Sequence, residues 1–353
     1  MTDADRLVER AVSGDLDALR ERTKADRHDP EATALPHALA GLLLLWGTRA
    51  EFDGYRHPTP PEAGTAGGLF RTARTVVARG TLREHPDEVD EVRRHKWVLD
   101  KLGTGPIRRQ SRTEQAISGL ANLLVQPDFL REYHRRGLFD WAEGDAEAAL
   151  LVANAWRHAV AAREPPKMTR TDEWETLQAV LADARGTHPE NPALEFVDAR
   201  CRLAWGALLP GDRDALVDAL DSLAADDRGR ATTLAARATL VDATVRFPTL
   251  DRLDADAAVD RLASSLSDVT PAVPRLDVLR AWAAVRDGDT ARATTLARTA
   301  ADADSAVVRA DAWQLLHAVD ETDAANQVGE TLVPKLRKRA VADLRTHLPE
   351  VGE

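Results

Sequence analysis

Apolar residues recur along most of this chain at the three- and four-residue spacing of an α-helix. Three segments that follow a Gly-Asp pair place small or apolar side chains five, eight, nine and twelve residues after the glycine. Positions i, i+3, i+4 and i+7 fall on one face of a helix. The matching sets are Ala149, Val152, Ala153 and Trp156 after Gly144, Leu216, Ala219, Leu220 and Leu223 after Gly211, and Ala293, Leu296, Ala297 and Ala300 after Gly288.

The Gly-Asp pair itself predicts a joint between two helices. Glycine ends a helix by adopting a left-handed conformation without a Cβ clash. The Asp that follows accepts hydrogen bonds from the free N–H groups of the next helix. A fourth pair, Gly14-Asp15, breaks a helical stretch from Asp3 to Thr23. That unit departs from the register, because Arg22, Thr23 and Asp26 occupy positions where apolar residues are expected.

Two further segments keep the register without a glycine. They place Leu177, Val180, Leu181 and Ala184 after Asp172, and Val259, Leu262, Ala263 and Leu266 after Asp254. Sustained period-two alternation of β-branched residues is absent, so strands are not expected. The sequence therefore predicts an all-α protein built from helix pairs.

The first part of the chain is less regular than the rest. We expect an apolar helix over 35–46, a Pro- and Gly-rich loop at 53–68 and a helix from Pro86 to Gly103. Ser111 to Glu114 has the form of a capping box and predicts the start of another helix. The predicted division is an irregular N-terminal helical region, 1–105, and a repeat array, 106–353, closed by a C-terminal capping helix.

Over roughly residues 130–320 the pattern resembles the tetratricopeptide-repeat (TPR) family. The resemblance rests on Gly144-Asp145 with Ala149, on Gly288-Asp289 with Ala293, on Ala184 followed by exit prolines, and on Tyr133 and Gly137 at first-helix positions. The family's large second-helix aromatic and its intact Trp-x-x-Leu-Gly motif are missing. The resemblance implies a right-handed superhelix of stacked antiparallel helix pairs, an α-solenoid.

A TPR-like superhelix binds a protein or peptide partner in its concave groove, which the first helices of the pairs line. The leading functional hypothesis is therefore an interaction scaffold rather than an enzyme. The repeat register assigns the following polar residues to the groove: Glu195, Asp198, Arg202, Arg237, Asp277 and Arg280.

Charge distribution raises a second hypothesis, nucleic-acid or phosphate binding. The chain has 47 Lys+Arg and 58 Asp+Glu, a net charge of −11, which counts against general polyanion binding. The Arg-rich region 93–136 is nevertheless basic, and its anion-binding candidates are Arg93, Arg94, Arg108, Arg109 and Arg112. The more ordinary interpretation is that these arginines pair with neighbouring carboxylates or with an acidic face of the array. The glycine-rich stretch 64–68, followed by Arg71 and Arg74, lacks the Lys-Ser/Thr of a phosphate loop and is expected to be a solvent loop.

An enzyme with a site assembled in space from the N-terminal part is the third hypothesis. The sequence has no nucleophile elbow, Walker loop, HExxH or dinucleotide fingerprint, so it predicts no cofactor and no catalytic residue. Asp87, Glu91 and His95 share one helical stripe, but acids at a helix start are favoured without a metal, and none is predicted. A pocket joining two of His85, His95, His134 and Glu91 would favour an enzyme.

The N-terminus is charged and lacks the apolar stretch of a secretory signal, and the longest apolar run, 35–46, is shorter than the roughly 20 residues of a membrane span. The single cysteine, Cys201, has no partner for an internal disulfide. These features predict a cytoplasmic protein.

Overall fold

Helices make up nearly all of the structure. The computed structural model describes residues 3–45, 51–52, 55–56, 60–86, 112–142, 145, 147, 149–151, 153, 171–205, 210–225, 229–246, 254–266, 274–303 and 306–332. Its helices are α1 (Asp3–Ser13), α2 (Leu16–Asp26), α3 (Leu35–Leu45), α4 (Pro60–Glu84), α7 (Arg112–Leu123), α8 (Pro127–Arg135), the 3-10 turn η3 (Asp140–Ala142), α10 (Thr171–Thr187), α11 (Pro192–Trp205), α12 (Pro210–Ala225), α13 (Arg230–Arg246), α14 (Ala255–Ser265), α15 (Pro274–Arg286), α16 (Thr290–Ala301), α17 (Ala306–Ala318) and α18 (Thr322–Leu332). The predicted all-α class is confirmed, with one two-residue antiparallel pairing of β1 (Glu51–Phe52) and β2 (Tyr55–Arg56) added to it.

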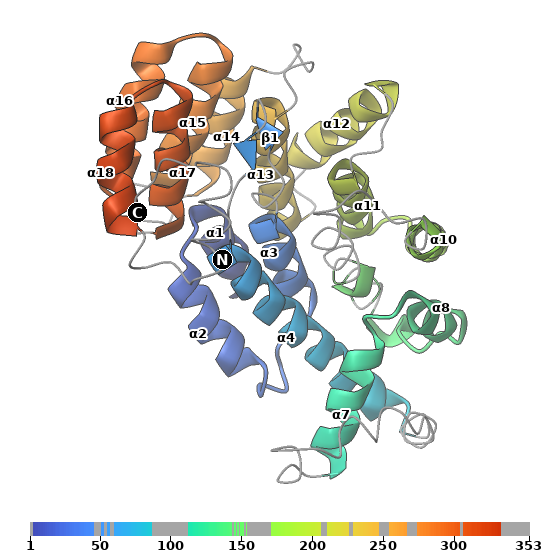
Figure 1. The fold of residues 1–353 in the computed structure, drawn as a ribbon. Coiled ribbons are helices and arrows are strands. Elements are labelled where there is room, and N and C mark those ends of the chain that lie inside the picture. Colours follow the sequence, from blue (N-terminus) through green and yellow to red (C-terminus); the bar gives the residue numbers. More distant parts are fainter. Residues whose placement is uncertain are drawn as a thin grey trace.

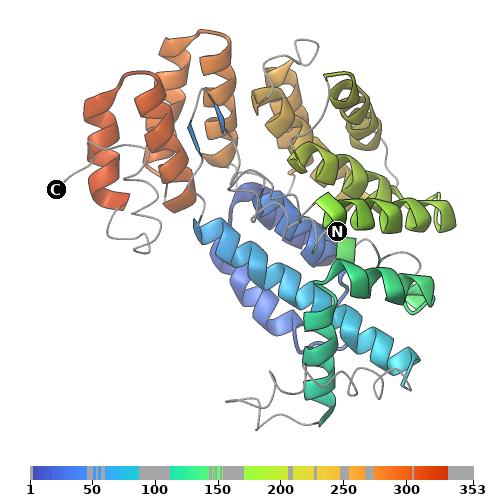
Figure 2. The same cartoon turned by 45° about the vertical axis from the view of Figure 1, so that its right-hand side comes forward.

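The helices from α7 to α18 follow one another along an arc, and α1 to α4 lie on its inner side (Figures 1 and 2). Along the arc each helix from α10 to α18 packs on the next one in the chain. The odd-numbered helices also contact one another from pair to pair, α11 with α13, α13 with α15 and α15 with α17. We call these four helices the odd-numbered layer.

The backbone turns in the same way at Gly14 and Gly288. Both glycines have φ of +77°, and in each case the following N–H donates to the carbonyl five residues back, at 3.0 and 2.9 Å. This is the hydrogen bond of a Schellman motif. The carboxylates of Asp15 and Asp289 then accept the backbone N–H three residues further on, at 3.1 and 3.0 Å. Both predicted joints are confirmed.

The predicted register is confirmed by burial in the helices that the structure describes. Val180, Leu181 and Ala184 are buried in α10, and Leu216, Leu220 and Leu223 are buried in α12. The same holds for Val259 and Leu262 in α14 and for Ala293, Ala297 and Ala300 in α16. Val152 and Trp156 lie outside the described residues.

One predicted turn and one predicted helical position are wrong. Gly211 lies inside α12, which begins at Pro210 because the fixed φ of proline suits the first helical position. Gly137, which the resemblance places in a first helix, instead follows α8 with φ of +67° and ends it. In contrast, Asp320 adopts the left-handed conformation, with φ of +61°, between α17 and α18.

The predicted loop at 53–68 is wrong from residue 60 onward, where α4 begins. Pro60 and Pro61 are tolerated there because the first turn of a helix has no intrahelical partners for their missing N–H groups. Inside α4, Gly80 allows close packing, whereas a Cβ at Gly64 would meet nothing within 4 Å. A Cβ at Gly80 would lie 2.0 Å from Cη2 of Trp141. Tertiary contact here outweighs the low helix propensity of glycine. The predicted helix 86–103 and the C-terminal capping helix lie beyond the described residues.

The largest hydrophobic cluster runs from Leu7 in α1 to Leu276 in α15, so N-terminal helices and array share one core. A second cluster joins α15 to α18 around Trp282 and Trp313.

Candidate functional site

The N-terminal helix α1 covers part of the odd-numbered layer. It contacts α13 and α15, and α3 also packs on α13. A side-chain ion pair fixes this arrangement, because Nη2 of Arg230 lies 2.5 Å from Oε1 of Glu9. The side chain of Glu9 is only 4% exposed, whereas that of Arg230 is 39% exposed. The TPR resemblance places a partner on the surface of the first helices. At α13 and α15 that surface is already covered by α1 of the same chain.

Three of the predicted groove residues lie together on α11. Asp198 is buried and accepts from Nη1 of Arg185 at 2.7 Å and from Nε of Arg202 at 2.8 Å. Glu195 lies half-buried one turn earlier. The side chains of Arg185 and Arg202 are 44% and 46% exposed, so this cluster presents two cations and ties α10 to α11.

Of the other three predicted groove residues, Arg237 and Arg280 bond to even-numbered helices, whereas Asp277 pairs with Arg280 within α15. Arg237 donates to a backbone carbonyl of α12 and to the hydroxyl of Ser265 at the end of α14. Nη2 of Arg280 lies 3.0 Å from Asp260 of α14, and its Nη1 lies 3.5 Å from Asp277. These contacts hold neighbouring helices together. A role for these residues in partner binding stays a prediction.

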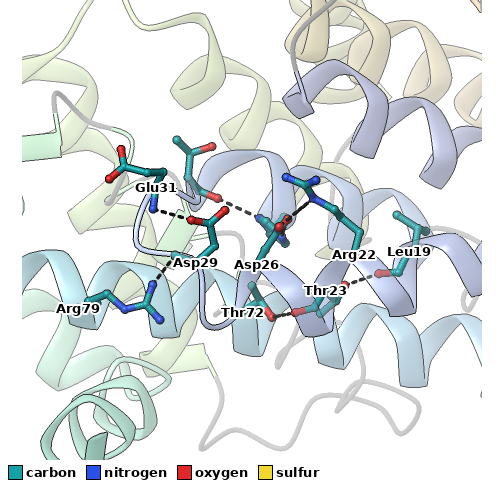
Figure 3. A network of polar contacts seen from close by, with 10 residues as sticks. Leu19, Arg22, Thr23, Asp26, Asp29, Glu31, Thr72 and Arg79 are labelled. Carbon is teal, nitrogen blue, oxygen red and sulfur yellow. Dashed lines mark hydrogen bonds and ion pairs between the residues drawn. The ribbon is translucent and has the colours of Figure 1, made fainter. Parts of the chain in front are cut away.

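Two of the three polar positions of the Gly14 unit, Thr23 and Asp26, are buried, and the third, Arg22, is half-buried. Leu19, Thr23 and Asp26 fall on the buried face of α2, in the register that α16 also follows. The hydroxyl of Thr23 donates to the carbonyl of Leu19, and that of Thr72 in α4 donates to the carbonyl of Thr23 at 3.2 Å (Figure 3). The stripe keeps its geometry because each polar group finds a partner.

Asp26 is the charged member of this stripe. Its carboxylate lies 2.8 Å from Nε of Arg22 and 3.0 Å from Nε2 of His37, whose Nδ1 lies 2.9 Å from the carbonyl of Thr33. Burial raises the pKa of Asp26, but the hydrogen bonds from His37 and Arg22 and their charges outweigh it, so the pKa lies below its usual range. The ionised carboxylate thus ties α2 to the start of α3 (Figure 3).

A second buried acidic group lies near α3. Asp145 accepts a hydrogen bond from the backbone N–H of Leu35, but burial raises its pKa to about 6, with a further contribution from the charge of Glu147. Nδ1 of His134 lies 3.6 Å from Oε1 of Glu147, and this partner raises the pKa of His134 in spite of burial. Asp145, predicted to cap its own helix, therefore bonds to a distant helix start.

Metal binding finds no support in the described residues, where no group of three His, Cys, Asp or Glu side chains could hold an ion. Asp87, Glu91 and His95 lie outside them, as do Arg93, Arg94, Arg108 and Arg109. Arg112 begins α7, with a side chain that is not described. Cys201 is buried, and burial raises the pKa of its thiol to about 12, so it is no ready nucleophile.

Sequence reasoning missed the polar groups that the N-terminal helices bury. Asp5 and Glu9, four residues apart in α1, are both buried. A signal existed, since charged residues interrupt the apolar face of α1 and polar residues replace the expected stripe of α2. Glu9 pairs with Arg230 of α13 and Asp26 with His37 of α3, and such distant partners have no sequence signature.

Compared with protein-family models, with curated proteins and with solved structures, the chain matches none. Among the described helices, none combines the length and the apolar character needed to cross a membrane.

Proposed function

We infer that the protein is an interaction scaffold, a TPR-like right-handed array of helix pairs that binds a protein or peptide partner. The observation that carries this proposal is the odd-numbered layer, in which α11, α13, α15 and α17 contact each other in succession. Successive contact between the first helices of helix pairs forms an extended surface, and arrays of this kind use such a surface for binding.

The packing of α1 on the odd-numbered layer supports a particular kind of partner, an amphipathic helix. α1 lies on α13 and α15, with Glu9 bonded to Arg230 of α13. Binding of a helix through its apolar face with an acidic anchor is a recurring recognition mode. The cations at Arg202 of α11 and at Arg185 of the adjacent α10 offer a similar anchor at the end of the layer, and both are nearly half exposed.

The test compares two single arginine substitutions of similar exposure. Arg202→Gln removes a cation from the odd-numbered layer, and Asp198 keeps Arg185 as its partner. Arg261→Gln is the matched control, because Arg261 is 47% exposed and pairs with Asp221 between the even-numbered α14 and α12. Tagged wild type and both variants are used for affinity capture from the native lysate, with and without nuclease, and read by quantitative mass spectrometry.

We expect one stoichiometric protein to be captured by the wild type and by Arg261→Gln, to survive nuclease and to be depleted at least several-fold by Arg202→Gln. Equal capture by all three proteins would remove the odd-numbered layer from the proposal. Loss of the partner on nuclease treatment would favour a nucleic-acid function.

A further inference from the structure

Two arginines at the contact of α2 and α4 have buried nitrogen atoms without hydrogen-bond partners. In the described part of the chain these atoms are Nε of Arg27 and both Nε and Nη1 of Arg74. Arg27 is the residue that follows α2, Arg74 lies within α4, and the two helices pack together. A buried guanidinium N–H without an acceptor loses its hydration without compensation, so such groups are rare in native proteins.

Charge makes the arrangement less favourable still. Burial, followed by repulsion from Arg71, lowers the pKa of Arg74 to about 10. The same two causes, in the same order, lower the pKa of Arg27. Among the described residues no carboxylate offsets the repulsion at either side chain. Arg71 is exposed, one turn before Arg74 on α4. Three cations therefore share a region in which no carboxylate of the described residues compensates Arg27 or Arg74.

The acidic residues closest in sequence to Arg27 have other partners. Asp26 is bonded to α3, as described above, and the carboxylate of Asp29 accepts the backbone N–H of Glu31 at 2.9 Å. Arg79, in α4, donates to the backbone carbonyl of Asp29 (Figure 3) and also to that of Arg27, which fixes the turn after α2. The backbone that carries Arg27 is thus held in place independently of its side chain.

We propose that Arg27, Arg71 and Arg74 form a binding site for the phosphoryl group of a small phosphorylated ligand. A phosphoryl group brings three acceptor oxygens and a charge near −2. The planar guanidinium fork matches those oxygens better than a point cation does. Because residues 64–68 are part of α4, the site consists of side chains and does not use a glycine-rich loop. The proposed site is distinct from the odd-numbered layer, and it does not depend on the proposed scaffold function.

The experiment titrates the whole protein with inorganic pyrophosphate at constant ionic strength, with potassium chloride as the comparison, and follows thermal unfolding and calorimetric binding. Arg74→Met removes the charge and keeps the length of the side chain. Arg83→Gln is the control, because Arg83 lies on the same helix, is exposed and pairs with Glu84. Arg71→Gln, at an exposed position, gives the same binding readout if Arg74→Met does not fold.

We expect pyrophosphate to raise the unfolding temperature of the wild type and of Arg83→Gln, and chloride to have little effect. In Arg74→Met and Arg71→Gln the affinity should fall at least tenfold, and Arg74→Lys should retain part of it. Without ligand, Arg74→Met should unfold at a higher temperature than the wild type, because it removes an unpaired buried charge. A merely structural arginine would show the opposite change.

The proposal is overturned if pyrophosphate does not bind the wild type, or if it binds the wild type and both variants equally. Equal binding would move the anion to another part of the chain, such as the arginines at 93–112. A short single-stranded RNA that binds more tightly than pyrophosphate and depends on Arg74 would replace the small ligand by nucleic acid.

Discussion

The helix pairs α1–α2 and α15–α16 have the same joint but different buried faces. Gly14 and Gly288 share a φ of +77°, and an Asp caps the second helix of each pair. In α16 the buried face consists of alanines, whereas α2 buries Leu19, Thr23 and Asp26. The joint alone therefore sets which positions face the neighbouring helices. The apolar character of those positions is not required, provided that polar side chains meet partners.

The two pairs also differ in where their partners lie. α16 packs on α15 and α17, its neighbours in the chain. In the first pair, α2 packs on α4 and α1 packs on α3, but α1 also packs on α13 and α15, which come much later. The Glu9–Arg230 ion pair joins residues 221 positions apart. An alanine face tolerates any well-packed neighbour, but a polar face accepts only the neighbour that carries the matching donor or acceptor. Buried polar contacts in α1 and α2 thus select one docking arrangement for the N-terminal helices.

The largest effect is expected when a charged residue is placed at a buried apolar position of α16. Ala300 and Asp26 occupy the same position twelve residues after their glycines, and Ala300 is fully buried. Ala300→Asp places a carboxylate in the hydrophobic cluster that joins α15 to α18, so we expect a loss of about 4 kcal/mol in the free energy of unfolding. Ala291→Asp, exposed in the first turn of α16, is the control and should cost nothing. Urea unfolding measures both, and a small loss for Ala300→Asp would show that burial in α16 is not strict.

Removing the charge from the polar stripe should have the next largest effect. Asp26→Asn weakens the contacts to Arg22 and His37 and is expected to cost about 2 kcal/mol at pH 7. The native pKa of Asp26 lies below its unfolded value of 3.8. Its contribution is therefore present above that value and is lost as the pH falls through the native pKa. Urea unfolding between pH 7 and 3 should show the two proteins converging in acid. Asp17→Asn, with a 92% exposed side chain on the same helix, should change stability little at any pH.

These two stripes show which features a sequence can predict. The joints at Gly14 and Gly288 depend on two adjacent residues, and the buried face depends on spacing along one helix, so both are local rules. The helix α4 replaces part of the predicted loop, and its glycines Gly68 and Gly80 lie against Thr23 and Trp141, which belong to distant segments. Asp320 has a left-handed backbone and forms a joint between α17 and α18 without a glycine, which the Gly-Asp pattern requires.

The candidate sites were less accessible to prediction for the same reason. The bonds of Asp198 to Arg202 follow a four-residue spacing and could be anticipated, whereas those of Arg237 and Arg280 depend on the neighbouring helices. The unpartnered nitrogen atoms of Arg27 and Arg74 can be recognised only in the structure, because they show as missing hydrogen-bond acceptors where α2 packs on α4.

Asp145 sharpens the comparison because it is a buried carboxyl whose pKa moves in the opposite direction. Its native pKa is about 6 against an unfolded value of 3.8, so ionisation becomes unfavourable to the fold as the pH rises between those values. Asp145→Asn keeps an acceptor for the N–H of Leu35 and removes the charge. We expect it to stabilise the protein by about 1.5 kcal/mol at pH 7. The gain should vanish near pH 4, as followed by urea unfolding. A loss of stability at pH 7 would mean that the charge at the start of α3 is favourable.

The joints themselves should respond alike in both pairs, although the effect is small. Alanine at φ of +77° is strained, so Gly14→Ala and Gly288→Ala should each cost about 1 kcal/mol. At Gly288 an added Cβ meets nothing within 4 Å, and at Gly14 its nearest contact, 3.6 Å to Arg275, is an ordinary one. Asp320→Gly relieves the corresponding strain and should stabilise by about 0.5 kcal/mol. Urea midpoints measure all three. Unequal costs at the two glycines would show that packing of α1 on α15, and not the joint alone, determines the geometry of the first pair.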